Sequence, residues 1–326
     1  MKLIRLLSRS AAVGACLFLA AQVQAQDPAY PDYPHDTVTL ITSSGPGGGG
    51  DIFLRQLTKV LGPAWGINFV VENVPGSGGA KAMQRIVDSP ADGTIFYGVS
   101  TQHIIVSLLS DPPVKYTDMQ PVVNVVFDAP VIYAPADFPF QTLTELLDHI
   151  RANPGTFKWG VGSAASGDRM AAEVIRKTQD LDFIIATHDS GGAQLVAVLG
   201  GSVEVGTGDA QEVAPHVEAG DLKILAALTA ERLPNYPDVM TANEQGVQVV
   251  PTRFRGIVGH KDLPPDVIAA WEEAIKLVLE DPEYAAVVKG NDMIPAPLPH
   301  DEYDRVTNAL AEESRELFTE LGIIQK

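Results

Sequence analysis

Short strand-like runs and longer helix-like runs alternate along almost the whole sequence, and this alternation restricts the chain to a small group of folds. The first strand-like run, Thr39–Thr42, is followed by a helix-like run from Ile52 to Leu61 and then by the strand-like run Phe69–Glu72. Such alternation predicts an α/β fold with mainly parallel central sheets and flanking helices. The further strand-like runs are Ile95–Gly98, Val122–Val126, Val131–Ala134, Lys158–Val161, Asp182–Ile185, Val203–Val205, Lys223–Ala226 and Gly256–Val258.

The chain has 326 residues of steady composition, which is more than one compact core usually holds and predicts two lobes. The apolar region Val122–Ala134 would carry the chain out of the first lobe, and the segment Val249–Gly256 would bring it back. We therefore predict a first lobe made of residues 26–127 plus 252–326 and a second lobe made of residues 128–251.

Two patterns predict how individual helices begin and pack. Thr142-Leu143-Thr144-Glu145 has the spacing of a capping box at the start of a helix. In the C-terminal third, five apolar residues recur at helical spacing and predict a stripe that packs into the core. They are Val267, Trp271, Ala274, Ile275 and Val278.

The first 25 residues have the pattern of a cleavable export signal. Three basic side chains precede the apolar stretch Ala11–Ala21, and Val23-Gln24-Ala25 places small residues before the expected cleavage site at Gln26. The only cysteine, Cys16, lies in this segment, and a lipoprotein cleavage site at Cys16 is the less favoured alternative. We therefore predict residues 1–25 to be a signal peptide and the mature protein to be periplasmic, without disulfides or thiol chemistry.

Acidic residues outnumber basic ones by 41 to 23, which gives a formal net charge of −18. Removal of the signal, which holds three basic and no acidic residues, leaves a net charge of −21. This balance argues against nucleic-acid binding, because neutralising phosphates requires clustered lysines and arginines. An anionic ligand would have to be attracted by local donors and not by the overall field.

A glycine-rich stretch, Ser43–Asp51, joins the first strand-like run to the helix that follows it. Such a turn leaves backbone N–H groups unpaired at the positive end of the helix, where they attract anions. The candidate ligand-binding residues of this loop are Ser43, Ser44, Gly47, Gly48, Gly49, Gly50 and Asp51.

The same loop fits a pattern of nucleotide-binding proteins. Gly45-Pro46-Gly47-Gly48-Gly49-Gly50 satisfies G-x-G-x-x-G, and Glu72 lies 22 residues beyond the last glycine, as in dinucleotide-binding folds. A P-loop is rejected because Asp51-Ile52 stands where Lys-Ser or Lys-Thr is required. The alternative function is therefore an exported nucleotide-dependent oxidoreductase that uses Gly45, Gly47 and Gly50.

A second loop of small residues, Trp159–Gly167, again joins a strand-like run to a helix. It would let a ligand approach the backbone closely, although its serines could equally be ordinary helix caps. Two such loops, one in each lobe, would form a pincer for a carboxylate. The candidate residues of the second loop are Ser163, Ala164, Ala165, Ser166 and Gly167.

Three arginines could supply positive charge, because arginine is suited to bidentate pairing with carboxylates. Arg169 lies one turn into the helix after the second loop, and Arg253 and Arg255 face one side of the extended return segment. Each could equally be a solvated surface group. Asp189 and Asp209, at two further strand-to-helix turns, are weaker ligand-binding candidates, and helix capping is the alternative role of Asp209.

Motifs for catalysis or metal binding are not found in the sequence. No serine stands in a G-x-S-x-G pattern, the seven histidines form no H-x-x-x-H pair, and no acidic run has EF-hand spacing. We therefore expect a binding protein without enzymatic activity, cofactor or metal.

Several short motifs follow one another in an order that is specific even though each motif is weak. In the order and spacing of these motifs the mature chain resembles the extracytoplasmic solute receptors of the tripartite tricarboxylate transporter family, often called Bug receptors. The motifs are Pro46–Ile52 with Arg55, Val71–Gly79, Ala91–Thr94, Ala152–Gly155, Gly162–Gly167, Ala171–Glu173, Gly200–Glu204, Ala219–Lys223, Glu231–Pro234 and Pro237–Val239.

The resemblance implies a two-lobed periplasmic binding protein of the Venus-flytrap type, similar to class II receptors. Such receptors hold a carboxylate between the first glycine loop and the loop equivalent to Ser163–Gly167. They then deliver it to a membrane permease of one large and one small subunit. We expect a monomer, and a sensor role for the same pair of lobes stays open.

The sequence departs from the family pattern near the expected cleft. Thr187–Gly191 stands where many members have a Pro-Tyr-Lys-Gly segment, and Arg169 stands where a histidine is common. Arg253-Phe254-Arg255-Gly256 replaces a more usual tryptophan-containing segment. The extra arginines would suit a ligand with two or three carboxylates, so we predict a di- or tricarboxylate.

Overall fold

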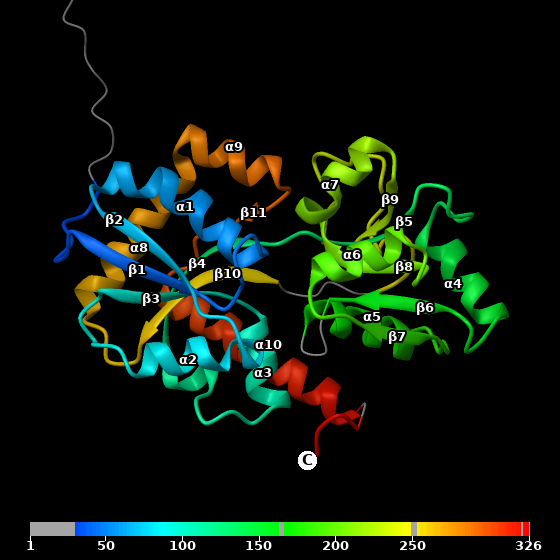
Figure 1. Ribbon diagram of the computed structural model, residues 1–326, viewed down its shortest axis with the longest axis horizontal. Coiled ribbons are helices and arrows are strands. Elements are labelled where there is room, and N and C mark those ends of the chain that lie inside the picture. Colours follow the sequence, from blue (N-terminus) through cyan, green and yellow to red (C-terminus); the bar gives the residue numbers. More distant parts are fainter. Residues whose placement is uncertain (1–29, 163–165, 249–252, 321, 326) are drawn as a thin grey trace, which may run out of the picture.

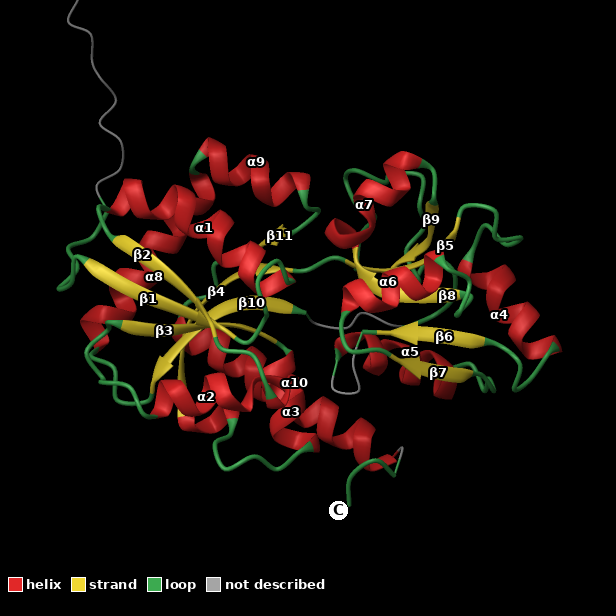
Figure 2. Cartoon of the chain, in the orientation of Figure 1, coloured by secondary structure: helices red, strands yellow, loops and turns green. Residues whose placement is uncertain are grey.

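The computed structural model describes residues 30–162, 166–248, 253–320 and 322–325. Within these residues two β-sheets, each flanked by helices, lie side by side along the long axis of the molecule (Figures 1 and 2). This arrangement confirms the predicted two-lobed α/β fold. The predicted signal peptide lies outside the described residues.

The first sheet has six strands in the order β11-β4-β10-β3-β1-β2. The strands are β1 (Thr37–Thr42), β2 (Asn68–Asn73), β3 (Ile95–Ser100), β4 (Met119–Phe127), β10 (Phe254–His260) and β11 (Ile294–Pro295). The helices around it are α1 (Gly49–Trp65), α2 (Ala80–Val87), α3 (Gln102–Leu109), α8 (Pro265–Glu280), α9 (Pro282–Gly290) and α10 (His300–Glu320).

The second sheet has five strands in the order β7-β6-β8-β5-β9. The strands are β5 (Pro130–Pro135), β6 (Lys158–Val161), β7 (Ile184–Thr187), β8 (Val205–Asp209) and β9 (Leu222–Ala227). The helices around it are α4 (Leu143–Ala152), α5 (Gly167–Thr178), α6 (Gly191–Leu199) and α7 (Ala210–Ala219). The predicted capping box at the start of α4 is confirmed, since the backbone N–H of Glu145 donates to the Thr142 hydroxyl over 3.2 Å.

Both sheets are mixed, whereas the sequence predicted mainly parallel ones. In the first sheet β1 is parallel to β2 and β3, but β10 is antiparallel to both β3 and β4. In the second sheet β6 is parallel to β7 and β8, but β5 is antiparallel to β8 and β9. The reason is that the chain reaches β5 from β4 of the first sheet and reaches β10 from β9 of the second sheet. Both β5 and β10 therefore start at the edge where the parallel strands end, and they run in the opposite direction.

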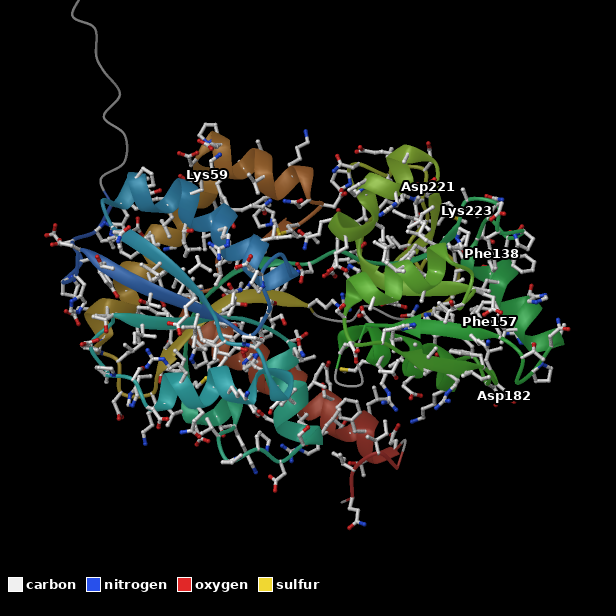
Figure 3. All side chains as sticks on the ribbon, in the orientation of Figure 1. Lys59, Phe138, Phe157, Asp182, Asp221 and Lys223 are labelled. Carbon is white, nitrogen blue, oxygen red and sulfur yellow. The ribbon has the colours of Figure 1, made fainter. Side chains whose placement is uncertain are left out.

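Each sheet has its own aromatic-rich core. In the first, Trp271 of α8 packs edge-on against Trp65 of α1, with ring centroids 5.3 Å apart. All five members of the predicted α8 stripe are buried, as expected. In the second, Trp159 stacks on Phe183 at 5.1 Å. Phe138 and Phe157 extend this second core at the end of the sheet that lies far from the first sheet (Figure 3).

The chain connects the two sheets twice between strands, once from β4 to β5 and once between β9 and β10. Contacts away from these connections also join the two sides. The backbone N–H of Asn235 donates to the carboxylate of the buried Asp292 over 3.2 Å, and the Ser314 hydroxyl of α10 lies 3.7 Å from the sulfur of Met170 in α5. The division of the chain into residues 26–127 plus 252–326 and residues 128–251 stays a prediction.

Candidate functional site

A cavity of about 1020 Å³ lies between the two sheets. Its walls come mainly from the loops that follow β1, β3, β6, β7 and β8, together with the start of β10. Because parallel strands end at the same edge of a sheet, these loops gather naturally on the facing edges. Of the predicted ligand-binding residues, those that line the cavity are Ser43, Ser44, Gly47, Gly48, Gly49, Gly50, Ser166, Gly167, Asp189, Asp209, Arg253 and Arg255.

Three residues of the second predicted loop, Ser163, Ala164 and Ala165, lie outside the described residues. Their neighbour Ser166 is the N-cap of α5 and accepts a hydrogen bond from the backbone N–H of Arg169 over 3.2 Å. Ser190 caps α6 in the same way over 3.1 Å. The helix-cap interpretation is therefore correct for Ser166, and both Ser166 and Ser190 still line the cavity.

Several backbone donors of the glycine loop after β1 are bonded within the loop. The N–H of Gly47 donates to the Asp51 carboxylate over 2.9 Å, and that of Gly50 donates to the Ser44 hydroxyl over 3.2 Å. Gly48 donates to the carbonyl of Gly45 over 3.0 Å. The N–H of Gly49, the first residue of α1, has no partner among the described residues. Fewer donors than the sequence suggested are thus available to an anion.

Asp51 holds this loop in place and does not line the cavity. It is only 4 % exposed, and its carboxylate accepts hydrogen bonds from Arg55 over 3.0 Å and from the Asn73 amide over 2.9 Å as well as from Gly47. The prediction that Asp51 contacts the ligand is therefore corrected to a structural role, because one buried carboxylate joins the loop, α1 and β2.

Replacing Asp51 by asparagine should lower the free energy of unfolding by roughly 1–3 kcal/mol, because an amide cannot accept all three hydrogen bonds. The pKa of Asp51 is lowered from 3.8 to about 2, chiefly by its hydrogen bond with Arg55. Its stabilisation is thus fully present above pH 3.8 and is lost as the pH falls through about 2. In urea titrations, the difference between variant and wild type should shrink from pH 5 to pH 2.

The matched control for this prediction is Asp148→Asn, which removes a carboxylate from an exposed ion pair with Arg151. Such a pair contributes little, so its loss should change the free energy of unfolding by about 0–1 kcal/mol. A destabilisation of Asp51→Asn that stays constant down to pH 2 would contradict the structural role of the carboxylate.

Arg169 also lies away from the cavity lining. Its guanidinium pairs along its own helix with the buried Glu173, with an Nε–Oε1 distance of 3.5 Å. The carboxylate of Glu173 also pairs with Arg176 on the same helix, with an Nη2–Oε2 distance of 2.5 Å. The expectation that Arg169 contacts the ligand is therefore not supported, because its charge is already paired with a buried carboxylate one turn further along the helix.

Arg253 and Arg255 are buried at the base of the cavity, and aspartates surround both. Arg253 donates to Asp209 through Nη1 and to Asp168 through Nη2. Arg255 donates through Nε to Asp128 over 2.5 Å and through Nη2 to Asp209 over 3.3 Å. These ion pairs join the start of β10 to the second sheet and its helices.

This network corrects two expectations from the sequence. Asp209 stands at the N-cap of α7 but makes no capping hydrogen bond, because its two oxygens accept from the arginines. The arginines in turn spend most of their donors on the aspartates. Two guanidinium nitrogens, Nε of Arg253 and Nη1 of Arg255, have no partner among the described residues. Burial raises the pKa of Asp128 to about 6 and also raises that of Asp168, despite the neighbouring arginines.

Glu212, which is not among the residues predicted from the sequence, also faces the cavity. It lies in the first turn of α7, its side chain is exposed to the cavity, and it makes no hydrogen bond or ion pair with the described residues. The enclosing walls, followed by the carboxylates of Asp209 and Asp168, raise its pKa to about 8. In the sequence, Glu212 stands three residues after Asp209, and this spacing is typical of a capping box at the start of a helix and does not by itself indicate a ligand site.

Within the described ranges no group of three or more His, Cys, Asp or Glu side chains is arranged to hold a metal ion. No helix in the same ranges is long and apolar enough to cross a bilayer. In the part of the chain that the structure describes, the site therefore consists of backbone donors, two guanidinium nitrogens without a partner, and carboxylates.

Comparison with known proteins is consistent with this architecture. A Cupriavidus necator protein, described as the UPF0065 protein in the gbd 5′ region, is 27 % identical over 96 % of this chain and 95 % of its own. The fold is shared with Rhodopseudomonas palustris Rpa4515 with adipate, at a TM-score of 0.82 and 19 % identity, covering 89 % of this chain and 99 % of that one. It is also shared with R. palustris MatC with bound malate, at a TM-score of 0.76 and 19 % identity, covering 87 % and 99 %.

The family model described as "Tripartite tricarboxylate transporter family receptor" matches residues 53–323. This match covers most of both sheets and all of the helices that follow α1. The chain therefore belongs to the receptors of the tripartite tricarboxylate transporter family.

Proposed function

We propose that this protein is an exported, non-catalytic receptor that captures a small organic carboxylate and delivers it to the permease of a tripartite transporter. The observation that carries the proposal is the cavity between the two sheets, where Gly49, whose N–H has no partner among the described residues, lies beside the guanidinium of Arg255. A Cβ placed on Gly49 would lie 3.4 Å from Nη1 of that guanidinium. A backbone donor at a helix N-terminus with a guanidinium beside it suits one carboxylate group.

The comparisons support a carboxylate as the ligand. The solved structures of similar fold contain adipate in one case and malate in the other. The sequence suggested two or three carboxylates because of Arg169, Arg253 and Arg255. Since each of these arginines already forms an ion pair with one of the protein's own acids, we propose that a single carboxylate is held at the Gly49 site.

Ligand capture would involve movement of the two sheets relative to each other. Ligand contacts with α1 on one side and with α6 or α7 on the other would stabilise the closed arrangement, which is a shift of population. The permease would then recognise the closed form. As part of this proposal the mature receptor is periplasmic and monomeric and works without a cofactor.

The alternative, a nucleotide-dependent oxidoreductase, is not proposed. A pyrophosphate on the G-x-G-x-x-G loop would need its free backbone donors. In this protein the N–H groups of Gly47 and Gly50 are bonded to Asp51 and Ser44, and Asp51 adds a negative charge beside the loop.

A thermal-shift screen of the chain from residue 26 to 326, unfolded and refolded to remove bound ligand, tests the proposal. A ligand at a hundred times its Kd should add roughly 2.7 kcal/mol of stability. For a protein of this size that corresponds to a rise in Tm of about 5–10 °C. We expect such a rise with a small carboxylate and none with NAD. A rise with NAD alone would overturn the proposal.

A further inference from the structure

Two sets of polar contacts, distinct from the arginine network, join the elements of the first sheet to those of the second. In one set, Asn235 in the segment after β9 meets Asp292 in the turn between α9 and β11. In the other, Ser314 of α10 meets Met170 of α5. Figure 1 shows α9 and β11 above the connections between the sheets, and α10 and α5 below them. Both sets adjoin parts of the chain that line the cavity, namely Asn291 and the start of α5.

The contact beside α9 consists of two hydrogen bonds. The backbone N–H of Asn235 donates to Oδ1 of Asp292 over 3.2 Å, and its side-chain amide donates to the carbonyl of Lys289 over 3.0 Å. Each partner is fixed to its own side of the molecule. Leu233 is buried in the core around β5 and β9, and Met293 is buried in the core around Trp271. The two hydrogen bonds therefore tie one core to the other.

Asp292 holds a backbone conformation that suits glycine better than aspartate. Its φ is +52°, in the left-handed region that side chains disfavour. The side chain is nevertheless an aspartate that is only 4 % exposed, and among the described residues its carboxylate accepts one hydrogen bond, from Asn235. An unfavourable backbone conformation kept at the rim of a cavity indicates a functional constraint. The contact with Asn235 supplies one.

The two sets of contacts differ in how easily they separate. Asn235 is exposed, so water can replace both of its hydrogen bonds when the contact opens. The contact between α5 and α10 involves Ser314, which is fully buried, and is reinforced by the ion pair between Lys177 and Glu320. Opening of the molecule should therefore begin beside α9, because that contact consists of hydrogen bonds within reach of solvent.

We propose that Asn235 and Asp292 form a latch that keeps the two sheets together on the α9 side of the cavity before any ligand is bound. Breaking the latch lets the α9–β11 turn move away from the segment around Asn235, while the contact between α5 and α10 persists. The latch makes the open form a minor state of the empty protein, so it sets how often the cavity is accessible. This inference rests on the movement of the two sheets proposed above, and it is independent of the ligand class.

Small-angle X-ray scattering of the ligand-free chain from residue 26 to 326, refolded to remove bound ligand, tests the latch. The wild type should have the radius of gyration of the structure. In Asp292→Gly the radius should increase, and the backbone N–H of Asn235 should exchange its hydrogen at least about fivefold faster. Glycine suits a φ of +52°, so thermal unfolding should show that this variant is still folded.

Asp180→Gly is the matched control for this substitution. Asp180 also has a left-handed φ, +49°, but it is exposed between α5 and β7, and its side chain makes no hydrogen bond or ion pair with the described residues. This variant should scatter like the wild type. Asn235→Ala, which removes the hydrogen bond to the Lys289 carbonyl from an exposed position, should open the molecule as Asp292→Gly does.

The latch is refuted if Asp292→Gly and the wild type share one radius of gyration and one exchange rate at Asn235. A wild type that is already more extended than the structure, or an Asp180→Gly variant that opens equally, would refute it as well. None of these measurements involves a ligand. A thermal-shift screen in which no carboxylate binds would therefore overturn the proposed function and leave the latch standing.

Discussion

Arg253→Ala is expected to lower the free energy of unfolding by about 3–5 kcal/mol, because it leaves buried carboxylates without their cation. The side chains of Arg253, Asp168 and Asp209 are all only 10–12 % exposed. Arg255 still contacts Asp209 in the variant, but Asp168 has no other cation among the described residues. A fall in Tm on the order of 10 °C, followed by circular dichroism, would be the measured effect.

The matched control is Arg169→Ala, which removes the same charge from a side chain that is 31 % exposed. Its partner Glu173 keeps Arg176, so a loss of about 1 kcal/mol or less is expected. Neutralising the stranded acids in the triple variant Arg253→Met, Asp168→Asn, Asp209→Asn should restore part of the stability. Equal losses for Arg253→Ala and Arg169→Ala would show that the buried network does not hold the base of the cavity together.

Gly50→Ala should both destabilise the protein and weaken ligand binding. An added Cβ would lie 2.5 Å from the Thr42 hydroxyl and 2.7 Å from that of Ser44, and Thr42 is buried and cannot move aside. The start of α1 would have to shift, which would carry the free N–H of Gly49 with it. Overpacking of this kind costs typically 1–3 kcal/mol. We expect the affinity for the carboxylate that gives the largest thermal shift to fall at least tenfold in titration calorimetry.

Gly45→Ala is the control within the same loop, because a Cβ at that position meets no atom within 4 Å. This variant should keep both the Tm and the affinity of the wild type. If Gly50→Ala binds as tightly as Gly45→Ala, the position of the α1 N-terminus does not govern binding, and the proposed carboxylate site would have to lie elsewhere in the cavity.

Local sequence patterns predicted most of the elements. The apolar run Phe69–Glu72 lies within β2, and the stripe that contains Trp271 is the buried face of α8. Strand boundaries were less accurate: the run Asp182–Ile185 predicted β7 about two residues too early. Periodicity and helix caps depend on residues a few positions apart, so the sequence shows them directly, whereas strand ends depend on the neighbouring strand.

The directions of β5 and β10 required the tertiary structure. Alternating strands and helices imply parallel neighbours, but a strand that crosses from the other sheet has no helix to set its direction. Neither the short connection from β4 to β5 nor the long one from β9 to β10 carries a sequence pattern that predicts at which edge of the sheet the next strand begins. Pairing of β10 with β3 and β4 is decided by contacts between segments more than a hundred residues apart.

The sequence by itself determined that this chain folds as two α/β lobes with a glycine loop ahead of α1, because periodicity and turn residues act locally. It also named Arg253 and Arg255 as cavity residues, from their place in the return segment. Only the tertiary structure decided that Asp128, Asp168 and Asp209 neutralise those arginines and that Glu212 is left facing the ligand space. Ion pairing is set by distance in space, and these partners lie 44 to 127 residues apart in the chain.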